Sequence, residues 1–249
     1  MKKNICLPLM FLILTSISCE VVNPKINPFY NDVVEKLSDA VEYEIKDKNL
    51  NAISIAILKQ NDFFWAEGFG FIDEEKKIKA DENTIYRVGS VSKLFTDIAI
   101  MKKRESGDID IDLPIQNYLP KFNPKNIFNN EPITLRQLMS HRAGILREPA
   151  YGNYFADNET SLEKTVESVS NSSLIHPPGT ITKYSNAGIA VVGYTLEKIF
   201  RKPYVEFMQE NILNPLNMNA SSFEFKNSMS LNLAEATMWS YDGRSFKAP

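Results

Sequence analysis

The sequence predicts an α/β (α+β) fold, in which an N-terminal β-hairpin belongs to an antiparallel sheet and a largely helical region follows. Two β-prone runs, residues 53–58 and 63–70, flank a short polar stretch typical of a turn. Apolar residues recur at helical spacing both before and after this hairpin. With 249 residues, 43% of them hydrophobic, the chain can bury one substantial core.

The first 19 residues have the pattern of a secretory leader. Lys2 and Lys3 precede an almost unbroken apolar run over residues 5–14, and small and polar residues follow. This run is about half of the roughly 20 residues that a membrane-spanning helix needs. We therefore expect residues 1–19 to be a signal peptide of an exported protein, and residues 20–32 to be a tether.

Cys19 closes this leader where bacterial lipoprotein signals place the cysteine that becomes acylated, although Ser16 stands where those signals usually have Leu. We expect lipidation of Cys19, which would anchor the protein to the membrane in the periplasm or cell envelope. The alternative is ordinary signal cleavage, in which Cys19 has no role. The other cysteine, Cys6, is also in the leader, so the mature body forms no internal disulfide.

Charge and histidine content exclude several classes of function. The chain has a net charge of −3, and removal of the leader takes away two lysines and no acidic residue. The longest basic cluster is Lys102–Arg104, so we expect no nucleic-acid partner. The two histidines have no paired spacing and predict no metal site, and no other cofactor is implied.

The helices are expected in a definite order along the chain. Apolar residues at three- and four-residue steps predict a first helix over residues 31–47. After the hairpin, a strongly apolar and therefore buried helix is expected from Ser90 to about Ser106, where Gly107 supplies a stop. Shorter and later helices are predicted over the following ranges: 135–140, 187–200 and 205–213.

A serine and a lysine three residues apart at a helix start can form an activated nucleophile. They lie on one helix face, and the helix N-terminus favours a developing negative charge. The pattern occurs twice, as Ser90 with Lys93 and as Ser161 with Lys164. Ser90 follows Gly89 and opens the apolar helix, whereas Ser161 opens a polar helix and is better explained as an N-cap. Ser90 and Lys93 are therefore the candidate pair.

The partner base is sought among tyrosines and histidines. The pattern Tyr-x-Asn also occurs twice, and Tyr184 lies between a turn and a well-formed helix, whereas Tyr151 lies in a polar loop. His141 and His176 accompany no Gly-x-Ser-x-Gly motif, so a Ser-His-Asp hydrolase is poorly supported. We interpret both histidines as structural, and Tyr184 as the partner of the nucleophile.

These motifs together resemble the serine β-lactamase-related family, which includes class C β-lactamases, D-alanyl-D-alanine carboxypeptidases and family VIII-type esterases. The similarity extends in the family's order over roughly residues 33–245. It is carried by the following segments: Trp65–Gly70, Tyr86–Thr96, Gly107–Asp112, Tyr118–Pro120, Ile133–His141, Pro178–Thr180, Tyr184–Asn186 and Pro215–Met218.

The resemblance implies a β-lactamase/transpeptidase-like fold over residues 33–249, with an inserted, mostly helical subdomain at about 108–220. It implies that Ser90 attacks a carbonyl and that Lys93 and Tyr184 transfer its proton. It further implies that Asn186 binds the substrate and that the Ser90 backbone N–H forms half of an oxyanion hole. The expected substrate is a small molecule or a peptidoglycan-type peptide: a β-lactam, a D-alanyl peptide or a small ester.

Two departures from the family pattern qualify this expectation. Asn217 stands where the family usually has Gly, a change that we expect to be tolerated. The family's late Lys-Thr-Gly or His-x-Gly triplet is absent, and we expect the C-terminal strands to be missing from a truncated chain. One alternative is a non-catalytic or inactive envelope protein that retains the fold. Another is an unrelated fold in which the four site residues are ordinary helix-start and loop residues.

Overall fold

The structure is a computed structural model that describes most of the chain after residue 29. The described residues are 30–59, 62–73, 75, 77–128, 131–153, 161–240 and 242–247. The predicted signal peptide and Cys19 lie outside them, as does most of the predicted tether. Within the described part, no helix is long and apolar enough to span a membrane. The chain divides into two compact units, residues 1–84 and 85–249, and each is described by itself.

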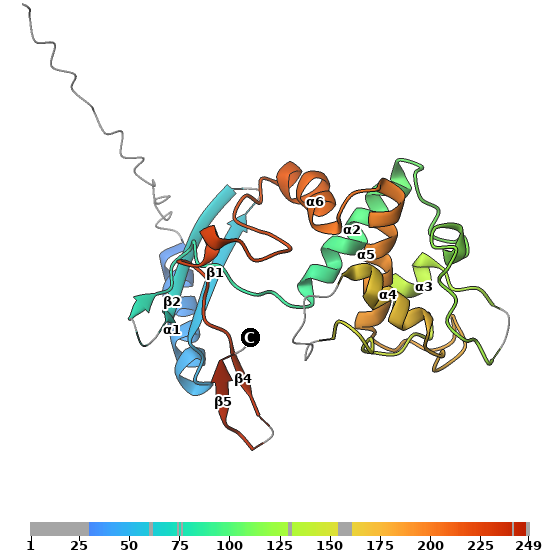
Figure 1. Ribbon diagram of the computed structural model, residues 1–249. Coiled ribbons are helices and arrows are strands. Elements are labelled where there is room, and N and C mark those ends of the chain that lie inside the picture. Colours follow the sequence, from blue (N-terminus) through green and yellow to red (C-terminus); the bar gives the residue numbers. More distant parts are fainter. Residues whose placement is uncertain are drawn as a thin grey trace, which may run out of the picture. The chain divides into compact units, whose positions relative to one another are not determined.

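The first unit contains the predicted helix and hairpin (Figure 1). Helix α1 (Asn31–Asp47) has the expected bounds, and strand β1 (Ala52–Lys59) pairs antiparallel with β2 (Asp62–Asp73). The short strand β3 (Ile78–Lys79) pairs with the other edge of β2, which gives the order β1-β2-β3. This antiparallel sheet, together with the helices that each unit contains, confirms the predicted α/β class.

The second unit is built around one long apolar helix, α5 (Asn186–Phe200), which packs against α2, α3, α4 and α6 (Figure 1). Nine of its fifteen residues are buried, because its sequence is apolar on nearly every face. The helices around it have the following bounds: α2 Val91–Glu105, α3 Leu135–Met139, α4 Leu162–Ser170 and α6 Tyr204–Met208.

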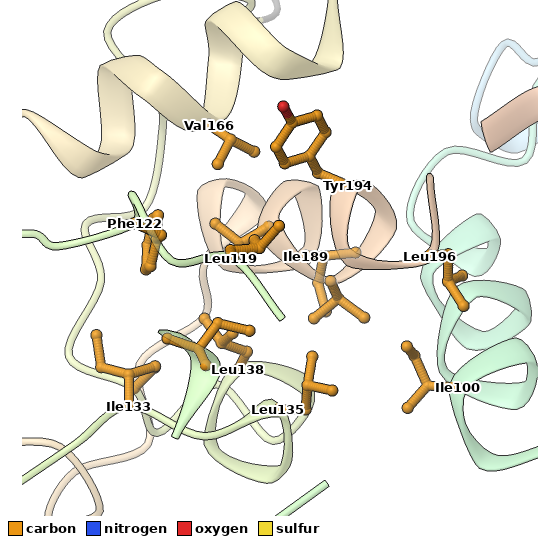
Figure 2. Packing of buried hydrophobic residues seen from close by; sticks show 14 of the residues in the cluster. Ile100, Leu119, Phe122, Ile133, Leu135, Leu138, Val166, Ile189, Tyr194 and Leu196 are labelled. Atoms are coloured by element: carbon orange, nitrogen blue, oxygen red, sulfur yellow. The ribbon is translucent and has the colours of Figure 1, made fainter. Parts of the chain in front are cut away.

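The core of the second unit gathers side chains from α5 and from the segments that surround it. Figure 2 shows Ile189, Tyr194 and Leu196 of α5 among these neighbours. Several short elements supply side chains to the same core. Leu138 belongs to α3 and Val166 to α4, and Leu119 follows the short 3-10 helix η2 (Ile115–Asn117). Burial of this apolar surface holds α5 in place, and α5 in turn fixes the residues at its own N-terminus.

Helix α2 is less buried than its apolar sequence predicts. Its bounds agree with the prediction, and Thr96, Ala99 and Ile100 are buried. However, Leu94 is 58% exposed, and three more apolar side chains of the same face are also exposed: Val91, Ile98 and Met101. Within the second unit, α5 and a later turn cover α2 on one side only. The expectation that the whole helix is buried is therefore wrong.

The end of the described chain contains structure that the sequence did not predict. The predicted helix over residues 205–213 divides into α6 and a π-helical turn, η3 (Gln209–Leu213). Two short 3-10 helices follow, η4 (Asn214–Leu216) and η5 (Asn227–Met229), and then strands β4 (Thr237–Trp239) and β5 (Ser245–Lys247) form an antiparallel hairpin. Asn217, at the position where Gly was expected, adopts a left-handed conformation with φ 55°.

Gly144 lies where the chain passes close to His176, and this contact predicts a large effect of substitution. Gly144 has φ +77°, and an added Cβ would lie 2.2 Å from the His176 carbonyl oxygen. Gly107 has φ +82° with no atom within 4 Å of such a Cβ. Gly107→Ala should therefore cost only the left-handed backbone strain, about 1–2 kcal/mol. Gly144→Ala should lower the free energy of unfolding, measured with urea, by clearly more than Gly107→Ala does. Equal losses for the two variants would contradict this account.

The burial of Asp97 on α2 predicts a loss of stability at neutral pH. Its Oδ1 is buried and has no hydrogen-bond partner among the described residues, and burial raises the pKa of Asp97 to about 6. Because this pKa lies above the ordinary value of 3.8, the folded state loses stability as pH rises from about 4 to about 6. Asp97→Asn should therefore stabilise the protein at pH 7.

The expected gain is on the order of 1 kcal/mol, because partial solvent contact screens the shift. Urea unfolding at pH 4, 5 and 7 measures it, and the gain should disappear at the lowest pH. Glu105→Gln, the same type of substitution at an exposed position of the same helix, is the control for the loss of one carboxylate. A variant Asp97→Asn that is no more stable than the wild type at pH 7 would refute the burial penalty.

Candidate active site

Ser90 is placed at the start of α2 in a conformation that leaves its hydroxyl available. It occupies the N-cap position, but its backbone is helical, with φ −68° and ψ −9°, and its side chain makes no capping hydrogen bond. The preceding residue, Gly89, has φ +51°, which glycine adopts without steric strain. The Ser90 side chain therefore points away from the helix amides that a serine at this position usually binds.

The Ser90 hydroxyl receives two hydrogen bonds from charged or acidic groups. Lys93 Nζ donates to Ser90 Oγ at 2.9 Å, across one turn of α2. Tyr184 donates its hydroxyl hydrogen to the same oxygen at 2.6 Å, from a position 94 residues away in the sequence. The structure therefore brings together three of the four residues that the sequence selected, around a single oxygen atom.

Tyr184 is held by the residue that follows it. Ser185 is the N-cap of α5 and is buried, and its Oγ accepts a hydrogen bond from Gly188 N at 2.7 Å. The same hydroxyl donates to the Leu146 carbonyl at 2.7 Å. Ser185 has an extended backbone, so Tyr184 leaves the helix start and extends toward Ser90.

Two cations lie close to the Tyr184 ring and favour its ionised form. Lys93 Nζ is 5.0 Å and Arg147 Cζ is 5.2 Å from the ring centroid. Burial by itself raises the pKa of Tyr184, but hydrogen bonds with Lys93 and Ser90 and the charges of Lys93 and Arg147 outweigh it. The net result is a Tyr184 pKa below its ordinary value of 10. A phenolate, which can accept a proton, is thus easier to form here.

Asn186, the fourth selected residue, lies at the first position of α5 and faces Glu148. Its Nδ2 donates to Glu148 Oε1 at 2.6 Å. Its Oδ1 is buried without a hydrogen-bond partner among the described residues. Because a carboxylate only accepts hydrogen bonds, Glu148 fixes the orientation of the Asn186 amide, with Nδ2 toward Glu148 and Oδ1 away from it.

A cavity of about 420 Å³ adjoins this cluster. Lys93, Glu148 and Asn186 line it together with apolar side chains from α4, α5 and the segment after η4. The apolar lining includes Leu162, Ile189 and Phe223. A cavity that combines apolar side chains with several polar groups is typical of a small-molecule site.

The other residues considered from the sequence lie in different settings. Ser161 caps α4, since its side chain accepts a hydrogen bond from Lys164 N, as the N-cap interpretation predicts. Tyr151 is exposed in a loop. His176 is buried, with Nδ1 3.1 Å from the Pro177 carbonyl oxygen. His141, in contrast, lies beside the cluster, with its ring centroid 4.5 Å from that of Tyr184.

Sequence reasoning did not select Arg147 or Glu148, and it gave His141 no place near Ser90. Arg147 and Glu148 follow the predicted short helix within an irregular segment that carries no recognisable chemical spacing. Only the docking of this segment on the start of α5, through hydrogen bonds from Asn186 N and Ala187 N to the Arg147 carbonyl, brings it to the site. Among the described residues, no group of three or more potential ligands could hold a metal ion.

Comparisons with known proteins show the family of the chain. A family model described as Beta-lactamase matches residues 33–247. The chain is 26% identical over 200 residues to Protein flp of Staphylococcus aureus (strain MRSA252), covering 80% of this chain and 40% of that protein. It is 31% identical over 234 residues to Beta-lactamase-like protein 2 of Dictyostelium discoideum, covering 89% and 42% of the two chains.

One solved structure agrees with these matches. The octameric penicillin-binding protein homologue from Pyrococcus abyssi has a TM-score of 0.74 and 30% sequence identity, and the match covers 87% of this chain and 50% of that chain. The fold is thus of the β-lactamase and penicillin-binding type. The chain spans less than half the length of the two curated relatives.

The environment of Tyr184 predicts an unusual titration. The difference in ultraviolet absorbance between the wild type and Tyr184→Phe should reveal one tyrosine that ionises below pH 10. Removing a nearby charge with Arg147→Met should move this midpoint to higher pH, because the guanidinium favours the phenolate. Arg136→Met, which removes a guanidinium paired with Asp112, is the control and should not move it. A midpoint at or above 10 in the wild type would contradict the assigned charge effect.

Proposed function

This chain belongs to the beta-lactamase family, and on that premise we propose that it is a serine hydrolase that forms an acyl-enzyme on Ser90. The observation that carries the proposal is the pair of hydrogen bonds that converge on Ser90 Oγ from Lys93 and Tyr184. A serine hydroxyl is a poor nucleophile at neutral pH unless an adjacent group takes its proton. Both neighbouring groups lie close enough to do so.

The proposed first step transfers the Ser90 proton to the Tyr184 phenolate while Ser90 Oγ bonds to the substrate carbonyl carbon. Lys93 stabilises the phenolate electrostatically, which agrees with the direction of the Tyr184 pKa shift. When the bond to the leaving group breaks, Tyr184 returns the proton to the leaving nitrogen or oxygen. The amide N–H of Ser90, at the start of α2, would donate to the oxyanion.

The second step releases the acyl group to water. A water molecule loses a proton to Tyr184 and attacks the ester carbon, and Ser90 recovers its proton when the ester bond breaks. Asn186 is proposed to bind the acyl side of the substrate, because it lines the cavity next to Lys93 and its Oδ1 has no hydrogen-bond partner among the described residues. No step in this sequence calls on a metal ion or an organic cofactor.

The proposed substrate is a β-lactam, a D-alanyl peptide of the peptidoglycan type or a small ester. All three present a carbonyl with a leaving group that needs a proton, which is the chemistry that Ser90 and Tyr184 can perform. Steady-state turnover of a chromogenic cephalosporin, a D-alanyl-D-alanine peptide and a p-nitrophenyl ester would rank the three. We further propose that the protein acts in the periplasm or cell envelope after export, with Cys19 as the site of lipid attachment.

Covalent labelling tests the nucleophile directly. After exposure to benzylpenicillin or to an activated p-nitrophenyl ester, intact-mass spectrometry should show one added penicillin or one acyl group on the wild type. Ser90→Ala should show neither adduct, because it lacks the hydroxyl.

The second Ser-x-x-Lys pair supplies the matched control. Ser161→Ala should lose about 1 kcal/mol of stability through its missing N-cap and yet label as well as the wild type. An adduct on Ser90→Ala, or no adduct with either reagent on folded wild-type protein, would overturn the proposed function.

A further inference from the structure

His141 contacts three consecutive residues of the segment that carries Tyr184. Its carbonyl oxygen accepts a hydrogen bond from Lys183 N at 2.8 Å. Its ring lies against the Tyr184 ring, with the centroids 4.5 Å apart and the planes inclined by 43°. Its Nδ1 accepts a hydrogen bond from Ser185 N at 3.3 Å. One residue therefore holds the backbone on both sides of Tyr184 and one face of its side chain.

We propose that His141 is a positioning residue that keeps the Tyr184 hydroxyl within hydrogen-bonding distance of Ser90. This inference rests on the proposed function, since it gives Tyr184 a task that depends on its exact placement. A displacement of about 1 Å can slow a positioned reaction by about a hundredfold. Tyr184 lies in an irregular segment before α5, where no regular backbone pairing fixes the ring.

The hydrogen bond to Ser185 N determines the form of the imidazole. Nδ1 must present a lone pair, so in the neutral ring the proton is on Nε2. Burial, and then the charge of Lys93, lower the pKa of His141, which keeps the ring neutral and able to accept at neutral pH. Protonation would replace the acceptor with a second donor facing Ser185 N–H.

The backbone of His141 also fits this role. His141 has φ +58°, a left-handed conformation that is uncommon for residues other than Gly and is least unfavourable for Asn, Asp and His. This conformation ends the turn after α3, whose last bonds include His141 N to the Leu138 carbonyl. The chain thus accepts a strained residue at a position that contacts Lys183, Tyr184 and Ser185 together.

Two substitutions separate the positioning role from simple damage to the fold. His141→Gly removes the side chain but tolerates the positive φ, so it should fold without backbone strain. His141→Asn also tolerates this conformation, and its Oδ1 can replace Nδ1 as the acceptor for Ser185 N. Circular dichroism and thermal melting of both variants check that each is folded.

The first readout does not depend on catalysis. The ultraviolet titration of Tyr184, measured against the matching Tyr184→Phe double variant, should move to higher pH in His141→Gly, because a displaced ring loses its hydrogen bonds to Ser90 and Lys93. In His141→Asn the midpoint should stay close to that of the wild type. An unchanged midpoint in His141→Gly would overturn the proposal even if the protein formed no acyl-enzyme.

The second readout is the rate of acylation by penicillin or by the p-nitrophenyl ester. We expect His141→Gly to be slower by about ten- to a hundredfold, and His141→Asn by less than about fivefold. If His141→Gly acylates at the wild-type rate, or if His141→Asn is as slow as His141→Gly, the positioning role is wrong. Failure of the wild type to acylate would instead count against the proposed function and leave the titration as the test of His141.

Discussion

The buried hydroxyl of Ser185 is the interaction on which the arrangement of the site depends. It donates to the Leu146 carbonyl and accepts from Gly188 N, and the residue is only 3% exposed. Loss of either bond would leave a buried polar group unpaired, at a cost of about 1–3 kcal/mol. The start of α5 and the irregular segment before Glu148 are therefore fixed to each other.

This connection explains why consecutive residues can serve different parts of one site. Ser185 has an extended backbone, and adjacent side chains of an extended chain point in opposite directions. With Ser185 directed into the protein, the Tyr184 side chain lies on the other side of the chain. Tyr184 reaches Ser90 on α2, whereas Asn186, already helical, reaches Glu148. A tripeptide thus links the nucleophile to the cavity next to it.

Much of the fold follows from periodicity in the sequence. Helices α1, α2 and α5 were predicted nearly to the residue because their apolar spacing is strong, and the hairpin was predicted from its β-prone runs. The β4–β5 hairpin was missed, because Asn- and Ser-rich sequence precedes it and its strands have only three residues each. The exposed face of α2 was missed for another reason. Spacing shows that a face is apolar, but it does not show which element covers that face.

The site was predictable only where its chemistry is local in sequence. Ser90 and Lys93 are three residues apart, and Tyr184 stands out by its place before a long apolar helix, so patterns could select all three. Arg147 and Glu148 come close to the site only in the folded protein, because their position depends on how an irregular segment packs against α5. No short-range pattern carries that information, because the partners are close to forty residues apart.

The two Ser-x-x-Lys pairs show how backbone conformation separates a nucleophile from a helix cap. Ser161 has an extended backbone, φ −69° and ψ 147°, so its hydroxyl turns back and accepts a hydrogen bond from Lys164 N. Ser90 precedes its helix with helical angles, and this geometry directs its hydroxyl away from the same amides. Both hydroxyls accept hydrogen bonds, but only that of Ser90 accepts them from side chains that can exchange a proton with it. Sequence context favoured Ser90, and the ψ angle supplies the physical reason that Lys93 and Tyr184 can reach its oxygen.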